Sequence, residues 1–368
     1  MLAQINKIIL SITILLSSVF ISGANKHDDK YLVFGLQQHY ASVLPHAKDL
    51  KKWAGTHPYG IQLDIGGFRN DEKSWAQCKC YSRIGFSFIW FDLGNHDTLG
   101  HSINTLFFYE PILMYRNRFH MTLKAGIGPS YLTNPYDEIS NPENEFFSAR
   151  ISYLLIMQLN FNYRITNHLS LNAAASYNHI SNGGIKLPNR GINFPGLKAG
   201  FEYSLKQKEF YNREENEKNF WKEKIRYDIS FYGTAKSIRK SEYYEQKYLP
   251  VFGLFGSASK RFSRFSSVLT GIEWASDGYV KEIMRRLNRD TDHNDIALLV
   301  GHELLMGKIS FSQILCVYVY NPYKGEDDAV YQRYFLRYQV SDHVHTGVTL
   351  KAHRHIAHIF DIRFGVNF

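Results

Sequence analysis

The chain has 368 residues, a formal net charge of +9 and a mean hydropathy of −0.31, enough length for one large domain or two smaller ones. Aromatic residues make up 15 % of it, yet beyond its first residues no stretch approaches the ~20 consecutive apolar residues of a membrane-spanning helix. A polytopic helical membrane protein is therefore excluded. The positive charge favours an anionic partner, although solvated basic loops account for it equally well.

Residues 1–24 have the pattern of an export signal. Lys7 supplies positive charge, Ile8–Phe20 is an apolar run too short to span a membrane, and Ser22-Gly23-Ala24 offers small residues for cleavage. We therefore expect export across an inner membrane. An exported chain rich in aromatic residues and without a spanning helix is typical of an outer-membrane barrel, whose apolar signal is spread over alternating strands.

Eight strand-like runs follow up to residue 205, and among them Gly60–Phe68 and Ile84–Leu93 are rich in β-branched and aromatic residues. They are Tyr31–Leu44, Gly60–Phe68, Ile84–Leu93, Ile103–Tyr115, Phe119–Leu132, Ala149–Tyr163, Leu169–Asn178 and Pro195–Leu205. Asn134–Asn144 contains two prolines and is predicted to be a longer loop. Residues 206–225 are strongly charged and are predicted to be a linker, a helix or a long loop.

The pattern of strands resumes in the second half of the chain. The predicted strands are Tyr227–Ala235, Tyr248–Ser259, Phe265–Ala275, Asp295–Leu305, Lys308–Tyr320, Val330–Val340, His343–Ala352 and a final run that ends at Phe368. Val280–Asp292 is charged and is predicted to be a loop or a short helix. In the final run, apolar residues from Phe360 alternate with polar ones, as lipid-facing and lumen-facing residues do in membrane barrels.

These runs predict an all-β fold, an antiparallel transmembrane β-barrel of about 14–16 strands. We favour one large barrel because closure removes every exposed sheet edge. The expected parts are a signal peptide (1–24), a first barrel half (25–205), a linker or loop (206–225) and further strands that complete the barrel (226–368). The alternative is an eight-stranded barrel over residues 31–205 plus a second barrel-like half.

One strand carries a candidate for chemistry. His179 and Ser181 continue the apolar face formed by Leu171, Ala173, Ala175 and Tyr177, and in a membrane barrel that face touches lipid. A serine becomes a nucleophile when a base such as histidine takes its proton, and a third group, here Asn193, orients the imidazole. Backbone amides near Asn182, Gly183 and Gly184 could stabilise an oxyanion. The plainer interpretation is a polar rim where the strand leaves the membrane.

The wider motif is more specific. His179-x-Ser-Asn-Gly-Gly followed by Pro188-Asn189-x-Gly191-Ile-Asn193 resembles the lipid A 3-O-deacylase (PagL) family, outer-membrane barrels that remove an ester-linked acyl chain from lipid A. The resemblance implies that His179 and Ser181 are the catalytic pair, that Asn182 belongs to the oxyanion region, and that the site lies on the lipid-facing wall. It covers residues 168–205 firmly.

Two departures from the family pattern matter. The family's acid, a glutamate twelve residues after the serine, falls on Asn193, which can hold a histidine tautomer but supplies no negative charge. The family barrel also ends near the equivalent of Leu205, whereas this chain continues with strand patterning to its last residue. The resemblance says nothing about that half.

The expected function is that of an outer-membrane serine esterase acting on lipid A, lipopolysaccharide or a related membrane lipid, with no metal or organic cofactor. The alternative is a catalytically inactive barrel that acts as a transporter, a porin or a lipopolysaccharide-binding protein. The chain contains no phosphate-binding glycine loop and no nucleic-acid module, and its oligomeric state is not indicated.

Overall fold

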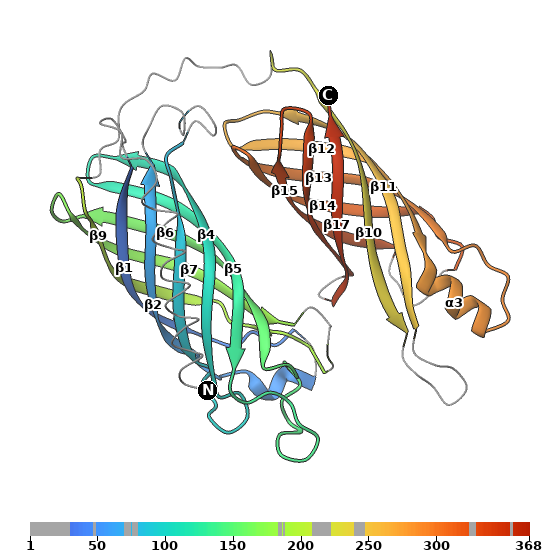
Figure 1. Ribbon diagram of the computed structural model, residues 1–368, viewed down its shortest axis with the longest axis horizontal. Helices are drawn as coiled ribbons and strands as arrows, with labels where there is room; N and C mark the ends of the chain where they lie inside the picture. The colour runs from blue at the N-terminus through green and yellow to red at the C-terminus, as the bar shows by residue number, and fades with distance from the viewer. Residues whose placement is uncertain are drawn as a thin grey trace, which may run out of the picture.

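The computed structural model of the protein describes residues 30–46, 49–69, 75, 80–182, 186, 188–207, 222–238, 247–323, 329–353 and 356–368. These residues form two antiparallel β-barrels, one after the other along the chain (Figure 1). The predicted signal peptide (1–24) and most of the charged stretch 206–225 lie outside the described residues. Among the helices that are described, none has both the length and the apolar character needed to cross a membrane.

Eight long strands close the first barrel in the order β1-β2-β3-β4-β5-β6-β7-β9 and back to β1. Their bounds are β1 Lys30–Ala41, β2 Tyr59–Arg69, β3 Ser82–Asp92, β4 His101–Arg116, β5 Phe119–Leu132, β6 Ile151–Arg164, β7 Leu169–Ser181 and β9 Gly196–Ser204. The two-residue β8 (Ile192–Asn193) pairs with the end of β7. Pro195, which has no N–H to donate, separates β8 from β9. A short 3-10 helix, η1, spans Asp49–Trp53.

The second barrel closes independently, with β17 pairing back onto β10. Its strands are β10 Arg226–Ile238, β11 Lys247–Arg261, β12 Ser266–Asp277, β13 Asn294–Met306, β14 Ile309–Tyr320, β15 Val330–Gln339, β16 Val344–His353 and β17 Ile356–Asn367. Between β12 and β13 lies helix α3 (Gly278–Arg286), whose N-terminal amides of Tyr279 and Val280 are capped by the Asp277 carboxylate. The prediction of a loop or short helix over Val280–Asp292 is confirmed.

The prediction of one barrel of 14–16 strands is wrong, and the alternative of two is confirmed. β9, which ends at Ser204, pairs with β1 and closes the first barrel. The first half therefore has no unpaired edge strand to which further strands could add. Residues 226–368 therefore do not complete the first barrel but form their own. Each of the sixteen predicted strands has a counterpart in the structure.

Alternation along the strands separates an apolar outer wall from a polar interior. On the outer wall, Leu36, Ile61 and Leu63 are each at least 50 % exposed, as are Ile229, Phe231 and Phe364 in the second barrel. The first lumen instead holds Arg83, which pairs with Glu110 at 2.6 Å and Glu202 at 2.9 Å, and the ion pair of Lys124 with Asp64. This arrangement is that of a transmembrane barrel.

Apolar clusters close the first barrel at both ends of this polar layer. Phe91, Leu132, Phe146, Ile180 and Ile192 belong to the larger cluster, at the end where β7 finishes. Tyr31, Phe68, Tyr81 and Ile112 belong to the cluster at the other end. An eight-stranded barrel is just wide enough for its own side chains to fill, so the described interior is a packed core and not a channel.

The second lumen is also filled. Arg333 lies between Glu273 and Asp361, and Arg337 reaches Asp228 at 2.9 Å. His345 points into this network, with Nε2 2.7 Å from Asp228. Tyr331 and Phe255 belong to the apolar layer that packs beside these charges.

Candidate active site

The end of β7 carries two kinds of side chain on opposite faces. Ile180 is fully buried in the apolar cluster that closes the barrel, together with Ile192, its partner across the β7–β8 pairing. Because neighbours in a strand point to opposite sides, burial of Ile180 turns His179 and Ser181 to the outer wall. Both are partly exposed there, in line with Tyr177, which is 44 % exposed. The predicted outward orientation is confirmed.

The register of the neighbouring strands surrounds this pair with apolar and aromatic side chains. On one side, β6 places Leu155 opposite His179 and Tyr153 opposite Ser181, and both β6 side chains are about half exposed. On the other side, β8 places Asn193 directly opposite His179. The polar groups therefore lie on a wall whose other members are suited to contact with lipid.

A hydrogen-bond network centred on Asn193 orients the imidazole. Its Oδ1 lies 2.6 Å from Nδ1 of His179 and accepts a second hydrogen bond, of 2.9 Å, from the Tyr177 hydroxyl. Its Nδ2 donates to Nδ1 of His46 at 3.1 Å. Since an amide oxygen only accepts, Nδ1 of His179 must carry the proton. Nε2 is then left as the basic nitrogen, which is the tautomer a general base requires.

Asn189 contacts the serine from the loop that follows β7. Its Nδ2 donates to Oγ of Ser181 at 2.9 Å, and its Oδ1 accepts from the Asn182 backbone N–H at 3.1 Å. The Asn182 side chain is buried and donates to the Lys186 carbonyl. The Asn182 backbone N–H could therefore donate to an oxyanion only after its hydrogen bond to Asn189 breaks. Gly183 and Gly184, the other predicted oxyanion residues, lie outside the described residues.

Gly191 lies against the imidazole edge. Its φ of +69° belongs to the left-handed region that side chains avoid, and an added Cβ would stand 2.8 Å from Cε1 of His179. The chain at this point is held by the loop between β5 and β6. The N–H groups of Arg190 and Gly191 donate to the carbonyls of Glu145 and Phe146, at 3.1 and 2.9 Å. Glycine is thus required both for its backbone conformation and for space.

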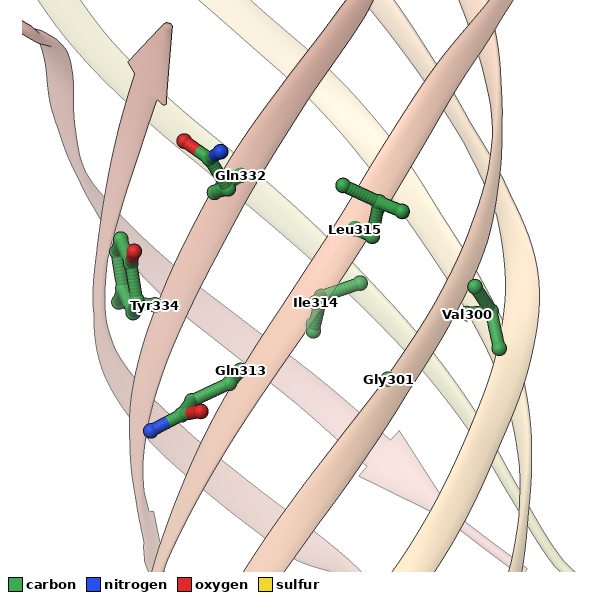
Figure 2. A pocket seen from close by; sticks show the side chains of 7 residues that line it. All are labelled: Val300, Gly301, Gln313, Ile314, Leu315, Gln332 and Tyr334. Carbon is green, nitrogen blue, oxygen red and sulfur yellow. The ribbon is translucent and has the colours of Figure 1, made fainter. Parts of the chain in front are cut away.

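A separate cavity of about 390 Å³ lies on the wall of the second barrel, away from His179 in the sequence. Figure 2 shows its lining, in which Gly301 leaves a gap between longer side chains from β13, β14 and β15. The lining residues are Val300, Gly301, Gln313, Ile314, Leu315, Gln332 and Tyr334. The Tyr109 hydroxyl of β4 lies 3.4 Å from the carbonyl of Met306, the last residue of β13. This wall therefore faces the first barrel.

Of the residues predicted from the sequence, the structure places His179 and Asn193 in contact, and Ser181 lies two residues further along the same face of β7. The structure adds His46, Asn189 and Gly191, to which the sequence argument gave no role. Asn189 and Gly191 belong to the quoted motif, so the sequence could have suggested a role for them. No residue pattern around His46 indicates its contact with Asn193. Glu202 points into the lumen and pairs with Arg83, so it faces away from the site.

The fold and its outer wall are those of an outer-membrane β-barrel protein. The model of the family described as "Lipid A 3-O-deacylase (PagL)" matches residues 58–202, and that of "Acyloxyacyl hydrolase, C-terminal domain" matches residues 225–368. The two matches follow the two barrels. The first barrel is thus similar to the lipid A 3-O-deacylase (PagL) family, and the second is similar to the C-terminal domain of acyloxyacyl hydrolases.

Similar solved structures include the outer-membrane enzyme PagL, at 13 % identity and a TM-score of 0.32, covering 47 % of this chain and 98 % of that one. Another is a mutant of the Rh. blastica porin, at 10 % identity and a TM-score of 0.20, covering 92 % of this chain and 100 % of that one. Scores this low support no further comparison. A search of curated proteins finds no match.

Proposed function

We propose that the first barrel is a serine esterase that hydrolyses an ester-linked acyl chain of lipid A or of a related membrane lipid. The observation that carries the proposal is the 2.6 Å contact of Asn193 with His179, on the outer wall and two residues before Ser181. This arrangement sets the histidine tautomer that a general base needs and presents it to the lipid layer, where the ester of a membrane lipid lies.

In the proposed reaction, Oγ of Ser181 attacks the acyl carbonyl carbon while Nε2 of His179 takes the hydroxyl proton. The tetrahedral intermediate collapses by breaking the bond to the sugar oxygen, which receives the proton from His179. Water then attacks the acyl-serine with His179 again as the base, releasing a fatty acid and restoring the serine hydroxyl. Asn193 holds the imidazole through both steps, and Asn189 orients the serine oxygen.

The substitution of an amide for a carboxylate is compatible with this chemistry. Asn193 Oδ1 accepts from both His179 and Tyr177, so its dipole is directed at the imidazolium that forms during the attack. A neutral amide stabilises that cation less than a carboxylate would. We therefore propose that His179 still acts as the general base, and that Asn193 stabilises its protonated form less than a carboxylate at that position would.

The experiment is mass spectrometry of lipid A from cells that express the protein or its Ser181→Ala variant. The expected result is loss of one acyl chain from lipid A with the wild type and none with the variant. Deacylation that persists with Ser181→Ala would reject the assignment.

The porin alternative finds no support in the described lumens, which are filled by buried ion pairs. Conductance across liposomes in the absence of esterase activity would revive it.

A further inference from the structure

The hairpin between β3 and β4 brings one buried carboxylate and two imidazoles together, at the barrel end where the candidate active site lies. Asp92 ends β3, His101 begins β4 and His96 stands in the turn between them. Oδ2 of Asp92 is 3.2 Å from Nε2 of His96 and 3.6 Å from Nδ1 of His101. All three donor atoms lie within 4.8 Å of one another.

The turn is built so that these groups converge. Gly94 and Gly100 adopt φ values of +79° and +64°, which fold the chain back over Asp92. The Asn95 carbonyl accepts the N–H groups of Leu99 and Gly100, and Leu99 is fully buried in the apolar cluster beneath. The backbone that carries the two histidines is thus fixed by hydrogen bonds and by burial, before any ligand is considered.

The carboxylate is held by its own partners. Oδ1 of Asp92 accepts the Gly94 N–H at 2.8 Å, and the Tyr59 hydroxyl donates to Oδ2 at 3.1 Å. Groups of this kind orient the ligands in metal sites. The His101 ring stacks on Trp90, with ring centroids 5.4 Å apart. Two of the three side chains are therefore fixed in place, and the exposed His96 completes the group.

The two separations from the Asp92 carboxylate suit ligands that share one metal ion. Four ligands at ~2.0–2.1 Å from a tetrahedral Zn²⁺ ion stand ~3.3 Å from one another, and the two Asp92 separations bracket that value. Nδ1 of His101 is buried and has no hydrogen-bond partner in the described chain, although the carboxylate is close by. Imidazole and carboxylate ligands are those that zinc takes in proteins.

We propose that Asp92, His96 and His101 bind a divalent transition-metal ion of the Zn²⁺ class. The His96 side chain is 68 % exposed, so the fourth coordination position opens to solvent. The ion would link His96 in the β3–β4 turn to Asp92 at the end of β3, and would thereby stabilise this turn above the apolar cluster. Binding at this site does not depend on the proposed esterase activity.

Hydrogen bonds to the loop between β5 and β6 connect this turn to the candidate active site. Asn134 Nδ2 donates to the His96 carbonyl at 2.8 Å, and Asn144 Nδ2 donates to the Thr98 carbonyl at 3.2 Å. Asn144 is followed by Glu145 and Phe146, whose carbonyls hold Arg190 and Gly191 beside His179. The metal site would therefore stabilise the same loop that positions the imidazole.

The test uses the purified, full-length protein in detergent micelles, without a histidine tag and after treatment with a chelator. Titration calorimetry with Zn²⁺ is expected to show one ion bound per chain, and Co²⁺ is expected to give the absorption bands of a tetrahedral site. His96→Ala and His101→Ala are expected to weaken Zn²⁺ affinity by at least ~10-fold each. His168→Ala, which removes an exposed histidine at the β6–β7 turn, is the matched control and should bind as the wild type does.

Because His96 is exposed, its replacement should leave the barrel folded, and the heat-dependent gel mobility of each variant checks this. A rise in melting temperature with added Zn²⁺ is expected for the wild type and the control, and not for the double variant His96→Ala/His101→Ala. Zn²⁺ affinity unchanged in that double variant, or no binding to the wild type at micromolar Zn²⁺, would overturn the proposal. The three groups would then form only an ion-pair cluster.

Discussion

Asn193 contacts His179 through its amide oxygen at 2.6 Å, and the same amide donates to His46 at 3.1 Å. The two contacts fix the orientation of the amide, since only the nitrogen donates and only the oxygen accepts. The proton on Nδ1 of His179 is thereby assigned from the network. In the proposed enzyme, the position that usually holds an acid is thus occupied by a group that orients without charge.

Two replacements of Asn193 distinguish its role in orienting the His179 imidazole from the effect of a negative charge at that position. We expect Asn193→Ala to lower kcat by ~10- to 100-fold, about 1.4–2.7 kcal/mol, because the imidazole loses the group that holds its tautomer. Asn193→Asp keeps the acceptor and adds a negative charge, which favours the protonated imidazole and raises its pKa. The pH at which the base loses its proton, and activity rises, should then move upward. Rates measured against pH on lipid A micelles check both variants.

An unchanged kcat in Asn193→Ala would show that another group orients His179. Tyr177→Phe is the control for the second hydrogen bond to the same oxygen, which it removes while Asn193 remains. We expect a smaller loss of activity from it than from Asn193→Ala, since the His179 contact persists.

The strands could be predicted from the sequence and their closure could not. Alternation is a local signal, so the runs around Leu171 and Phe364 predict both a strand and its lipid-facing side. Closure depends on contacts between residues far apart in the sequence, such as Leu36 with Phe201. These contacts decide whether β1 pairs with β9 or with β17. Two barrels of eight strands and one of sixteen give the same alternation.

The candidate site divides in the same way. The outward position of His179 follows from counting residues by twos, because it needs only the strand period. The contact of Asn189 with Ser181 depends on the course of a loop that the period does not describe. The contact of His46 with Asn193 joins residues 147 positions apart, and no local pattern indicates it.

Asn189 is expected to assist the serine without being essential. Asn189→Ala removes the hydrogen bond to Oγ of Ser181 and the acceptor for the Asn182 N–H, so we expect kcat to fall by ~10-fold, about 1.4 kcal/mol. Labelling of Ser181 by a fluorophosphonate provides the measurement, since it reports the nucleophile directly. A labelling rate equal to that of the wild type would show that the contact has no role in activation.

Gly191 tests whether space beside the imidazole is required. An alanine there would carry a backbone cost of ~1–2 kcal/mol for its positive φ, and its Cβ would displace the His179 ring. A displacement of about 1 Å lowers rates by ~100-fold, which is the expected loss of kcat. Gly67→Ala is the matched control in the same barrel, since its Cβ would lie 4.0 Å from its nearest neighbour, the Ile84 carbonyl oxygen. Loss of activity in both variants would indicate a general effect on folding.

The two barrels should keep their folds after the chain between them is cut. Within the described residues, the first barrel closes by pairing β1 with β9 and the second by pairing β10 with β17, so neither needs a strand from the other. A protease site inserted between Gln207 and Lys222 would allow cleavage in the assembled protein. After cleavage we expect both fragments to keep the altered gel mobility of a folded barrel until they are boiled. If the fragment that begins near Arg226 instead migrates as an unfolded chain without heating, its closure must depend on the covalent link to the first barrel.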